Sequence, residues 1–140
     1  MADVAAFQAL ADATRLRIMK LLTSESQSIC VCELVDALGL PQYLVSKHLT
    51  VLRQAGLVEV DRLGTWAGYR PHKSPSPLCQ AIYDLVDRKL AGPSYERDLA
   101  RLRARMELRE GGRCVVGYND PRVPPLLGAA EQQGGEASAK

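Results

Sequence analysis

The strongest constraint on this fold is a pair of short amphipathic helices joined by a tight turn. Four apolar residues from Val31 to Leu38 repeat at the i, i+3, i+4, i+7 spacing of one helix face, and Gly39 is suited to end that helix. Pro41 then suits the first turn of a second helix, which stops at Gly56. The buried stripe of this second helix is Val45, Leu49 and Leu52. Two short helices joined by a Gly-Leu-Pro turn are typical of a helix-turn-helix.

The segment that follows changes from helical to strand-like periodicity. Leu57, Val58 and Val60 form an apolar, largely β-branched run, and a turn at Gly64 separates it from an aromatic stretch that ends at Arg70. This pattern predicts a small β-hairpin. A hairpin directly after the second helix of a helix-turn-helix is a wing, so the expected fold is mainly α with a small β-hairpin wing, a winged helix-turn-helix.

Further helices are expected on both sides of this unit. Residues 3–22 have a helical pattern interrupted near Ala11 to Thr14, Pro77 can start another helix, and a strongly charged helix follows Gly92-Pro93. The first helix and the Leu78–Leu90 helix carry more apolar surface than a three-helix core needs, which favours a homodimer. We expect one DNA-binding and dimerisation domain over 1–110 and a flexible C-terminal tail over 111–140 that carries Cys114.

Composition and motifs exclude several classes of protein. A chain with 46% hydrophobic and 24% charged residues is typical of globular proteins. No apolar run approaches the ~20 residues of a membrane span, and the N-terminus lacks the basic region of a secretory signal, so a cytoplasmic protein without a membrane partner is expected. With two histidines, no glycine-rich phosphate loop and no nucleophile motif, the chain is not expected to be an enzyme.

The exposed side of the second helix has the chemistry of a surface that binds double-stranded DNA. The net charge of +2 is nearly neutral, but five basic and two acidic residues between Pro41 and Lys73 leave a local excess of three. The side chains that we expect to contact phosphates or base edges are Gln42, Tyr43, Ser46, Lys47, His48, Thr50, Arg53, Arg62 and Arg70. His48 can instead pack against the core, and Trp66 and Tyr69 can either brace the hairpin or stack on bases. A purely structural or protein-interaction role is the alternative that this polar face disfavours.

At this point the sequence resembles a known family. The stretch ALADATRLRIMKLL, followed by ICVCELVDALGLPQYLVSKHLTVLRQAGLVEVDRLGTWAGYRP, resembles the ArsR/SmtB family of metal-responsive repressors over roughly Phe7 to Leu90. The resemblance implies a homodimer that binds operator DNA when ligand-free and dissociates when an inducer ion binds, without catalytic activity.

The cysteines indicate which inducer the resemblance implies. The ICVCEL segment is similar to the Cys-Val-Cys-Asp-Leu-Cys signature of the branch that senses trivalent arsenic and antimony, with Cys30 and Cys32 at its first two cysteines and Val35 at the third. Trivalent arsenic prefers three thiolates. The third sulfur is expected from Cys114, beside Arg113, with Cys79, a second subunit or a small thiol as alternatives. Two thiolates alone would suit a methylated arsenic species.

Helix geometry limits how these two cysteines can share an ion. Residues two apart on a helix point about 200° from each other, so Cys30 and Cys32 can hold one ion only if the helix unwinds or begins after Cys30. Ion binding would then move the first helix of the DNA motif and, through it, the second.

Other uses of the thiols fit the sequence less well. A zinc site on the late helix would have Asp84 and Asp87 but no histidine, and a cadmium or lead site of the family's kind needs a cysteine before Ile29. Oxidation of Cys30 or Cys32 as a redox switch remains an alternative. A thiol oxidoreductase is disfavoured because the βαβ context is missing.

Overall fold

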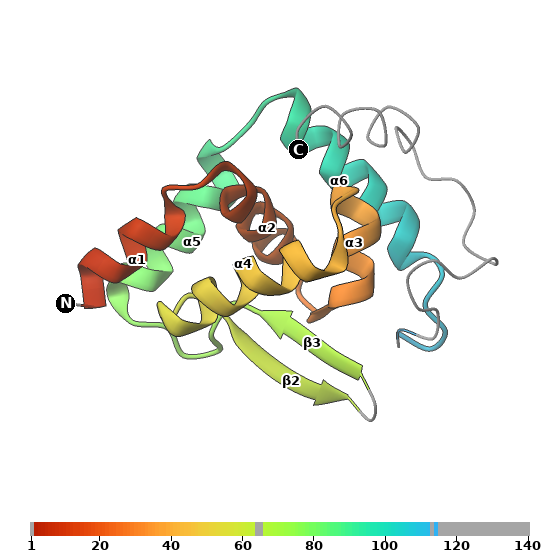
Figure 1. The fold of residues 1–140 in the computed structure, drawn as a ribbon, viewed down its shortest axis with the longest axis horizontal. Coiled ribbons are helices and arrows are strands. Elements are labelled where there is room, and N and C mark those ends of the chain that lie inside the picture. Colours follow the sequence, from red (N-terminus) through yellow and green to blue (C-terminus); the bar gives the residue numbers. More distant parts are fainter. Residues whose placement is uncertain (1, 64–65, 113, 115–140) are drawn as a thin grey trace.

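The structure is a computed structural model that describes residues 2–63, 66–112 and 114, and within these residues it has six helices and three strands (Figure 1). The elements are α1 (Ala2–Leu10), α2 (Ala13–Ser24), β1 (Ile29–Cys30), α3 (Val31–Leu38), α4 (Gln42–Gln54), β2 (Glu59–Leu63), β3 (Trp66–Arg70), α5 (Pro77–Lys89) and α6 (Pro93–Met106). This is the mainly helical fold with a small hairpin that the sequence predicts.

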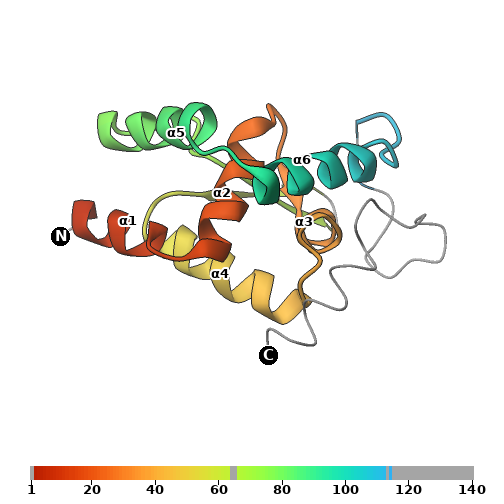
Figure 2. The ribbon, with the colours of Figure 1, turned by 90° about the horizontal axis from the view of Figure 1, so that it is seen from above.

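The helices pack around a central pair. Helices α2 and α3 lie in the middle, with α5 and α6 on one side and α4 on the other (Figure 2). Of the aliphatic stripes that the sequence predicts to be buried, Val31 and Val35 are only partly buried against this core, and the other side chains lie in it with at most 1% of their surface exposed. These side chains are Leu34, Leu38, Val45, Leu49 and Leu52. Burial of this shared core fixes the angle between the two helices of the helix-turn-helix.

The turn between α3 and α4 follows the local chemistry of its residues. Gly39 has a φ of 69°, in the left-handed region that glycine adopts without strain, and its N–H donates to the Val35 carbonyl at 2.9 Å. Pro41 is the residue before α4 rather than a member of its first turn. The predicted helix-turn-helix is therefore confirmed, with the start of α4 shifted by one residue.

The sheet contains the predicted hairpin and one strand that the sequence pattern does not reveal. Strands β2 and β3 pair antiparallel, with Asp61 opposite Gly68. The two-residue strand β1 pairs with the other edge of β3, where Cys30 lies opposite Gly68, so the strand order is β1-β3-β2. A two-residue strand is too short to have a periodicity, which is why periodicity could not predict it.

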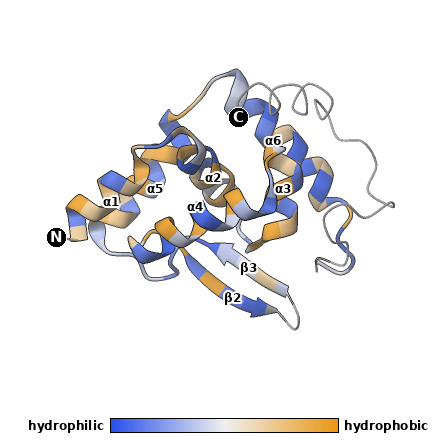
Figure 3. Cartoon of the chain, in the orientation of Figure 1, coloured by the Kyte–Doolittle hydropathy of each residue, from blue (hydrophilic) through white to orange (hydrophobic). Residues whose placement is uncertain are grey.

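Helix α6 is hydrophilic in composition (Figure 3), yet several of its charged side chains are buried. Arg101 and Arg105 are fully buried, and Arg105 pairs with Asp36 of α3 at 2.6 Å. The buried carboxylate of Asp98 accepts two hydrogen bonds from the Arg17 guanidinium of α2, at 2.7 and 2.9 Å. Bidentate pairs of this kind fix orientation as well as distance, so α6 is held in a set position on α2 and α3.

Apolar side chains remain exposed on the two elements that we expect to form a dimer interface. Val4 and Phe7 on α1 and Leu85 on α5 each expose about half of their surface. Dimerisation through them stays a prediction. The predicted tail over 111–140 lies outside the described residues except for Gly111, Gly112 and Cys114. Within the described ranges, each helix lacks the length and apolarity needed to cross a membrane.

The Arg17–Asp98 pair yields a test of how α6 is held. We expect Asp98→Ala to lower the free energy of unfolding by about 3–5 kcal/mol, because it removes the buried carboxylate with which both Arg17 and Arg101 pair. Asp87→Ala, on the exposed side of α5, should change it by no more than about 0.5 kcal/mol. Urea denaturation of both variants measures the difference, and equal stabilities would contradict the anchoring role of Asp98.

Candidate metal centre and nucleic-acid interface

Three of the four cysteines lie together in one buried cluster. Cys30, Cys32 and Cys114 expose 1%, 2% and 7% of their surfaces and pack against one another. The Sγ atoms of Cys32 and Cys114 are 3.4 Å apart, and the Sγ atoms of Cys30 and Cys114 lie within 4.8 Å of each other. Cys114 follows α6 and is 82 positions from Cys32, so the tertiary fold brings these thiols together.

The backbone at the start of α3 explains why Cys30 and Cys32 can share a site. Cys30 has extended dihedral angles (φ −74°, ψ 154°), and the helix begins at Val31. The condition set by helix geometry, that the helix begin after Cys30, is thus met without unwinding. Pairing of Cys30 with Gly68 in the sheet holds it in this extended conformation.

Cys79 lies apart from the cluster. It is half-buried on α5 within the main hydrophobic core, where its thiol donates a weak hydrogen bond to the Gly56 carbonyl at 3.7 Å. Of the two cysteines proposed as the third sulfur, the fold therefore brings Cys114, and not Cys79, to Cys30 and Cys32, and a sulfur from a second subunit or a small thiol stays an untested alternative. Trp66 of the hairpin is a partly buried neighbour that packs against this cluster.

A buried ion pair borders the cluster, and the sequence analysis did not identify it. Glu33 is fully buried; its Oε1 accepts from the Cys30 backbone N–H at 2.9 Å and from Arg109 Nη2 at 2.6 Å, and its Oε2 accepts from Arg109 Nε at 2.7 Å. The same guanidinium donates to the Ser28 carbonyl and to Gln27 Oε1. The only sequence signal was a glutamate three residues after Cys30, the spacing of a capping box.

The surroundings of Cys30 and Cys32 favour the protonated form of these two thiols. The hydrogen bond with Cys114 and burial raise the pKa of Cys32 to about 12. Hydrogen bonds with Cys114 and Cys32, together with burial, hold the pKa of Cys30 well above its ordinary value as well. A thiol with a raised pKa is a poor ligand for a hydrated cation until it loses its proton.

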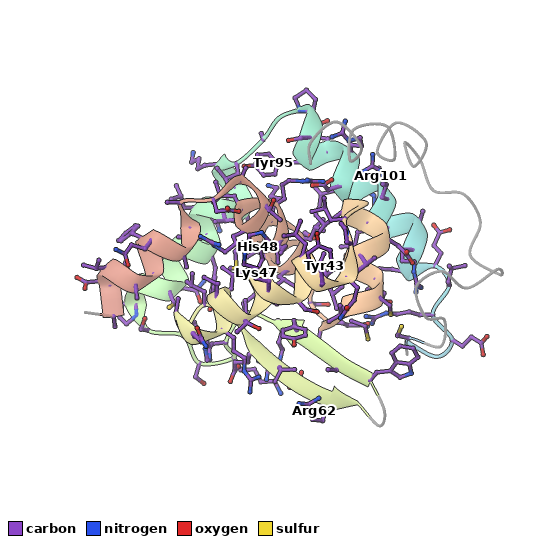
Figure 4. All side chains as sticks on the ribbon, viewed as in Figure 1. Tyr43, Lys47, His48, Arg62, Tyr95 and Arg101 are labelled. Atoms are coloured by element: carbon purple, nitrogen blue, oxygen red, sulfur yellow. The ribbon has the colours of Figure 1, made fainter. Side chains whose placement is uncertain are left out.

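The exposed face of α4 carries most of the side chains expected to bind DNA (Figure 4). Tyr43 is 68% exposed, and Lys47 and Thr50 are exposed one and two turns further along the helix. Gln42 Nε2 donates to Ser46 Oγ at 2.8 Å, and both residues belong to the same face. The remaining exposed members of the predicted set are Arg53 near the end of α4 and Arg62 on β2.

Two members of the predicted set lie in less accessible positions. His48 is buried, and its Nδ1 is 3.1 Å from Arg15 Nη1 of α2, while burial lowers its pKa. This supports the alternative in which His48 packs between helices. Arg70 donates to both oxygens of Asp61, at 2.7 and 3.0 Å, and pairs with Glu59, so two carboxylates already balance its charge. Its contact with DNA stays a prediction.

These features define a class of protein: a winged helix-turn-helix with a polar outer helix face and a buried thiol cluster under its first helix. Residues 12–60 match the family described as "Bacterial regulatory protein, arsR family". The chain belongs to this family, because it also covers 70% of a relative to which it is 48% identical.

That relative is an uncharacterized HTH-type transcriptional regulator, MJ1325, from Methanocaldococcus jannaschii, and the match spans 45% of this chain. The arsenical resistance operon repressor of Escherichia coli K12 is 47% identical over 47% of this chain and 57% of its own length. The transcriptional repressor SmtB of Mycobacterium tuberculosis H37Rv is 51% identical over 45% of each chain. The chain thus spans only about half of these last two proteins.

A solved structure shares the fold. HlyU from Vibrio cholerae superposes with a TM-score of 0.54 at 30% sequence identity, and the alignment covers 62% of this chain and 89% of that one. The winged helix-turn-helix predicted from the sequence is thereby confirmed.

The raised thiol pKa values lead to a test by alkaline unfolding. A thiol whose pKa rises from 9.0 to about 12 on folding contributes stability fully below pH 9 and loses it as the pH rises toward 12. We therefore expect the free energy of unfolding of the wild type to fall with pH above pH 9 more steeply than that of Cys32→Ser, by up to about 1.4 kcal/mol per pH unit. Denaturation at pH 8 to 10.5 measures this loss, with Cys79→Ser as control. Parallel curves for wild type and Cys32→Ser would contradict the raised pKa.

Proposed function

We propose that this protein is a homodimeric transcriptional repressor that binds double-stranded operator DNA when ligand-free and is released by trivalent arsenic or antimony bound to Cys30, Cys32 and Cys114. The observation that carries the proposal is that three buried sulfurs from distant parts of the chain meet at the start of α3, the first helix of the DNA-binding motif. We place its action in the cytoplasm, where the operator lies.

The chemistry of the cluster suits a trivalent metalloid. Trivalent arsenic takes three soft sulfur ligands, and three thiols are present. Neutral arsenous acid carries three hydroxyl groups, and each thiol that binds arsenic passes its proton to one hydroxyl, which leaves as water. Thiols with raised pKa values can complete this exchange without releasing protons, whereas a divalent cation must expel them. Arsenite, antimonite and methylated arsenic share this chemistry.

Two contacts support a route from the thiols to the DNA-binding elements. Cys32 lies in the first turn of α3, which packs on α4. Cys30 pairs with Gly68 of the hairpin, and Trp66 of the same strand packs against the cysteine cluster. Drawing three sulfurs onto one ion would therefore move both α3 and the wing, and α4 must sit accurately in the major groove to bind. In a dimer the same shift would change the spacing between two half-sites.

Release of DNA by arsenite tests the proposal. In fluorescence anisotropy with the reduced protein on its own upstream DNA, arsenite should release the wild type. The serine variants of Cys30, Cys32 and Cys114 should need at least tenfold more arsenite, because each loses one of three sulfur bonds.

Cys79→Ser is the matched control, since this thiol lies outside the cluster and its loss should leave the arsenite response unchanged. If arsenite failed to release the wild type, or released the Cys114→Ser variant equally well, the proposed site would be wrong.

The DNA surface can be tested separately from the inducer. We expect Lys47→Ala to weaken operator binding and to reduce the slope of log K against log salt by roughly 0.9, the value for one lost phosphate contact. Lys89→Ala, at the exposed end of α5, should leave the slope unchanged. An unchanged slope for Lys47→Ala in a salt titration would argue against a phosphate contact by that side chain.

One distance favours a second candidate function, a thiol redox switch. The Sγ atoms of Cys32 and Cys114 are 3.4 Å apart, close enough to form a disulfide with little movement. Peroxide would take the two electrons and two protons of the thiols and leave as water. The raised pKa of Cys32 slows the first step, because the thiolate is the reactive form. Release of DNA by peroxide and its reversal by a reductant would favour this function over metalloid sensing.

A further inference from the structure

The thiol cluster has an oxygen neighbour that could act as a fourth ligand. The Sγ atoms of Cys30 and Cys114 and a carboxylate oxygen of Glu33 all lie within 4.8 Å of one another, and Cys32 joins the same cluster. Three sulfurs with one carboxylate oxygen would form a four-ligand set, the number that divalent zinc and, by analogy, cadmium prefer. If the Glu33 carboxylate were free to bind a metal, the site would suit these cations.

The Glu33 carboxylate is already fully engaged. Arg109 donates to both of its oxygens, at 2.6 and 2.7 Å, and the Cys30 N–H donates to one of them. Glu33 has no exposed surface and the Arg109 side chain exposes only 8%. A cation approaching this carboxylate would have to displace a bidentate guanidinium and leave that charge without a partner in a buried site.

Arg109 is also held from its other side. Its Nη2 donates to the Ser28 carbonyl at 2.7 Å, and its Nη1 donates to Gln27 Oε1 at 2.8 Å and to the Gly112 carbonyl at 3.3 Å. The planar guanidinium can satisfy these acceptors and both Glu33 oxygens at once, which a lysine cannot do. The guanidinium is therefore held on the carboxylate from both sides.

We propose that Arg109 is a specificity-determining residue: by occupying both oxygens of Glu33 it withholds the fourth ligand and limits the site to ions that three sulfurs satisfy. This proposal rests on the proposed function and specifies it. Trivalent arsenic and antimony need only three ligands, whereas zinc and cadmium are left one ligand short. The buried Glu33–Arg109 ion pair thus discriminates between metal ions because it makes the Glu33 carboxylate unavailable as a ligand.

The test compares the affinities for arsenite and for cadmium chloride in the full-length reduced protein. We expect Arg109→Gln to raise the cadmium affinity about tenfold or more relative to that for arsenite, because it frees a carboxylate beside the thiols. The double variant Glu33→Gln/Arg109→Gln should lose this gain. Cadmium NMR gives a readout independent of affinity: the resonance should move when oxygen joins the ligands of Arg109→Gln and return in the double variant.

Two control variants show whether a change in the ratio of cadmium to arsenite affinity comes from the Glu33 carboxylate or from a general disturbance of the structure. Gln27→Ala removes one anchor of the Arg109 guanidinium but leaves Glu33 occupied, so the ratio of affinities should not change. Arg103→Gln changes an exposed arginine of α6 and should have no effect. Because Arg109→Gln leaves a buried carboxylate uncompensated, Arg109→Lys provides a milder variant that keeps the charge and should show a smaller gain for cadmium.

The outcomes distinguish this proposal from the proposed function. An unchanged ratio in folded Arg109→Gln or Arg109→Lys protein, or an equal gain in the double variant, would overturn the role of Arg109. A wild type that binds cadmium more tightly than arsenite would overturn it as well. If arsenite binds with the expected ratios but does not release DNA, the specificity role stands and the proposed function fails.

Discussion

The change from extended to helical backbone between Cys30 and Val31 is the feature on which the rest of the site depends. It allows Cys30 to pair with the hairpin while Cys32 belongs to α3, and it turns both thiols toward the same buried space. A helix that began earlier would send the two side chains to opposite sides. The carboxylate of Glu33 accepts the Cys30 N–H at this point, so one side chain stabilises the helix start and borders the thiols.

Much of the fold could be predicted because it is encoded locally. The apolar stripes of α3 and α4 and the left-handed Gly39 can be recognised in short windows of sequence, and the structure confirms them. The β-branched run of the hairpin is a signal of the same kind. Strand β1 was missed because only its partner strand, some forty positions away, makes it a strand. Pairing at that distance leaves no trace in local periodicity.

The site was predictable only in part for the same reason. Cys30 and Cys32 stand out as a motif, and Cys114 could be favoured over Cys79 because it lies outside any apolar helix. Cys114 is buried against Cys30 and Cys32, which lie more than eighty positions earlier, and Arg109 likewise binds Glu33 and Ser28 from more than seventy positions away. Arg101 and Arg105 of α6 look like a solvated charged face in the sequence, whereas the fold surrounds them with acceptors and counter-charges. Charge alone does not distinguish these two situations.

The position of Trp66 gives the molecule a built-in optical signal. It is the one tryptophan of the chain, and it packs against the cysteine cluster from the strand that also pairs with Cys30. Indole emission responds to nearby sulfur, to heavy atoms and to the entry of water. The fluorescence of the unlabelled protein therefore responds both to a change at the thiols and to a movement of the wing. Both changes can be followed in time through this single residue.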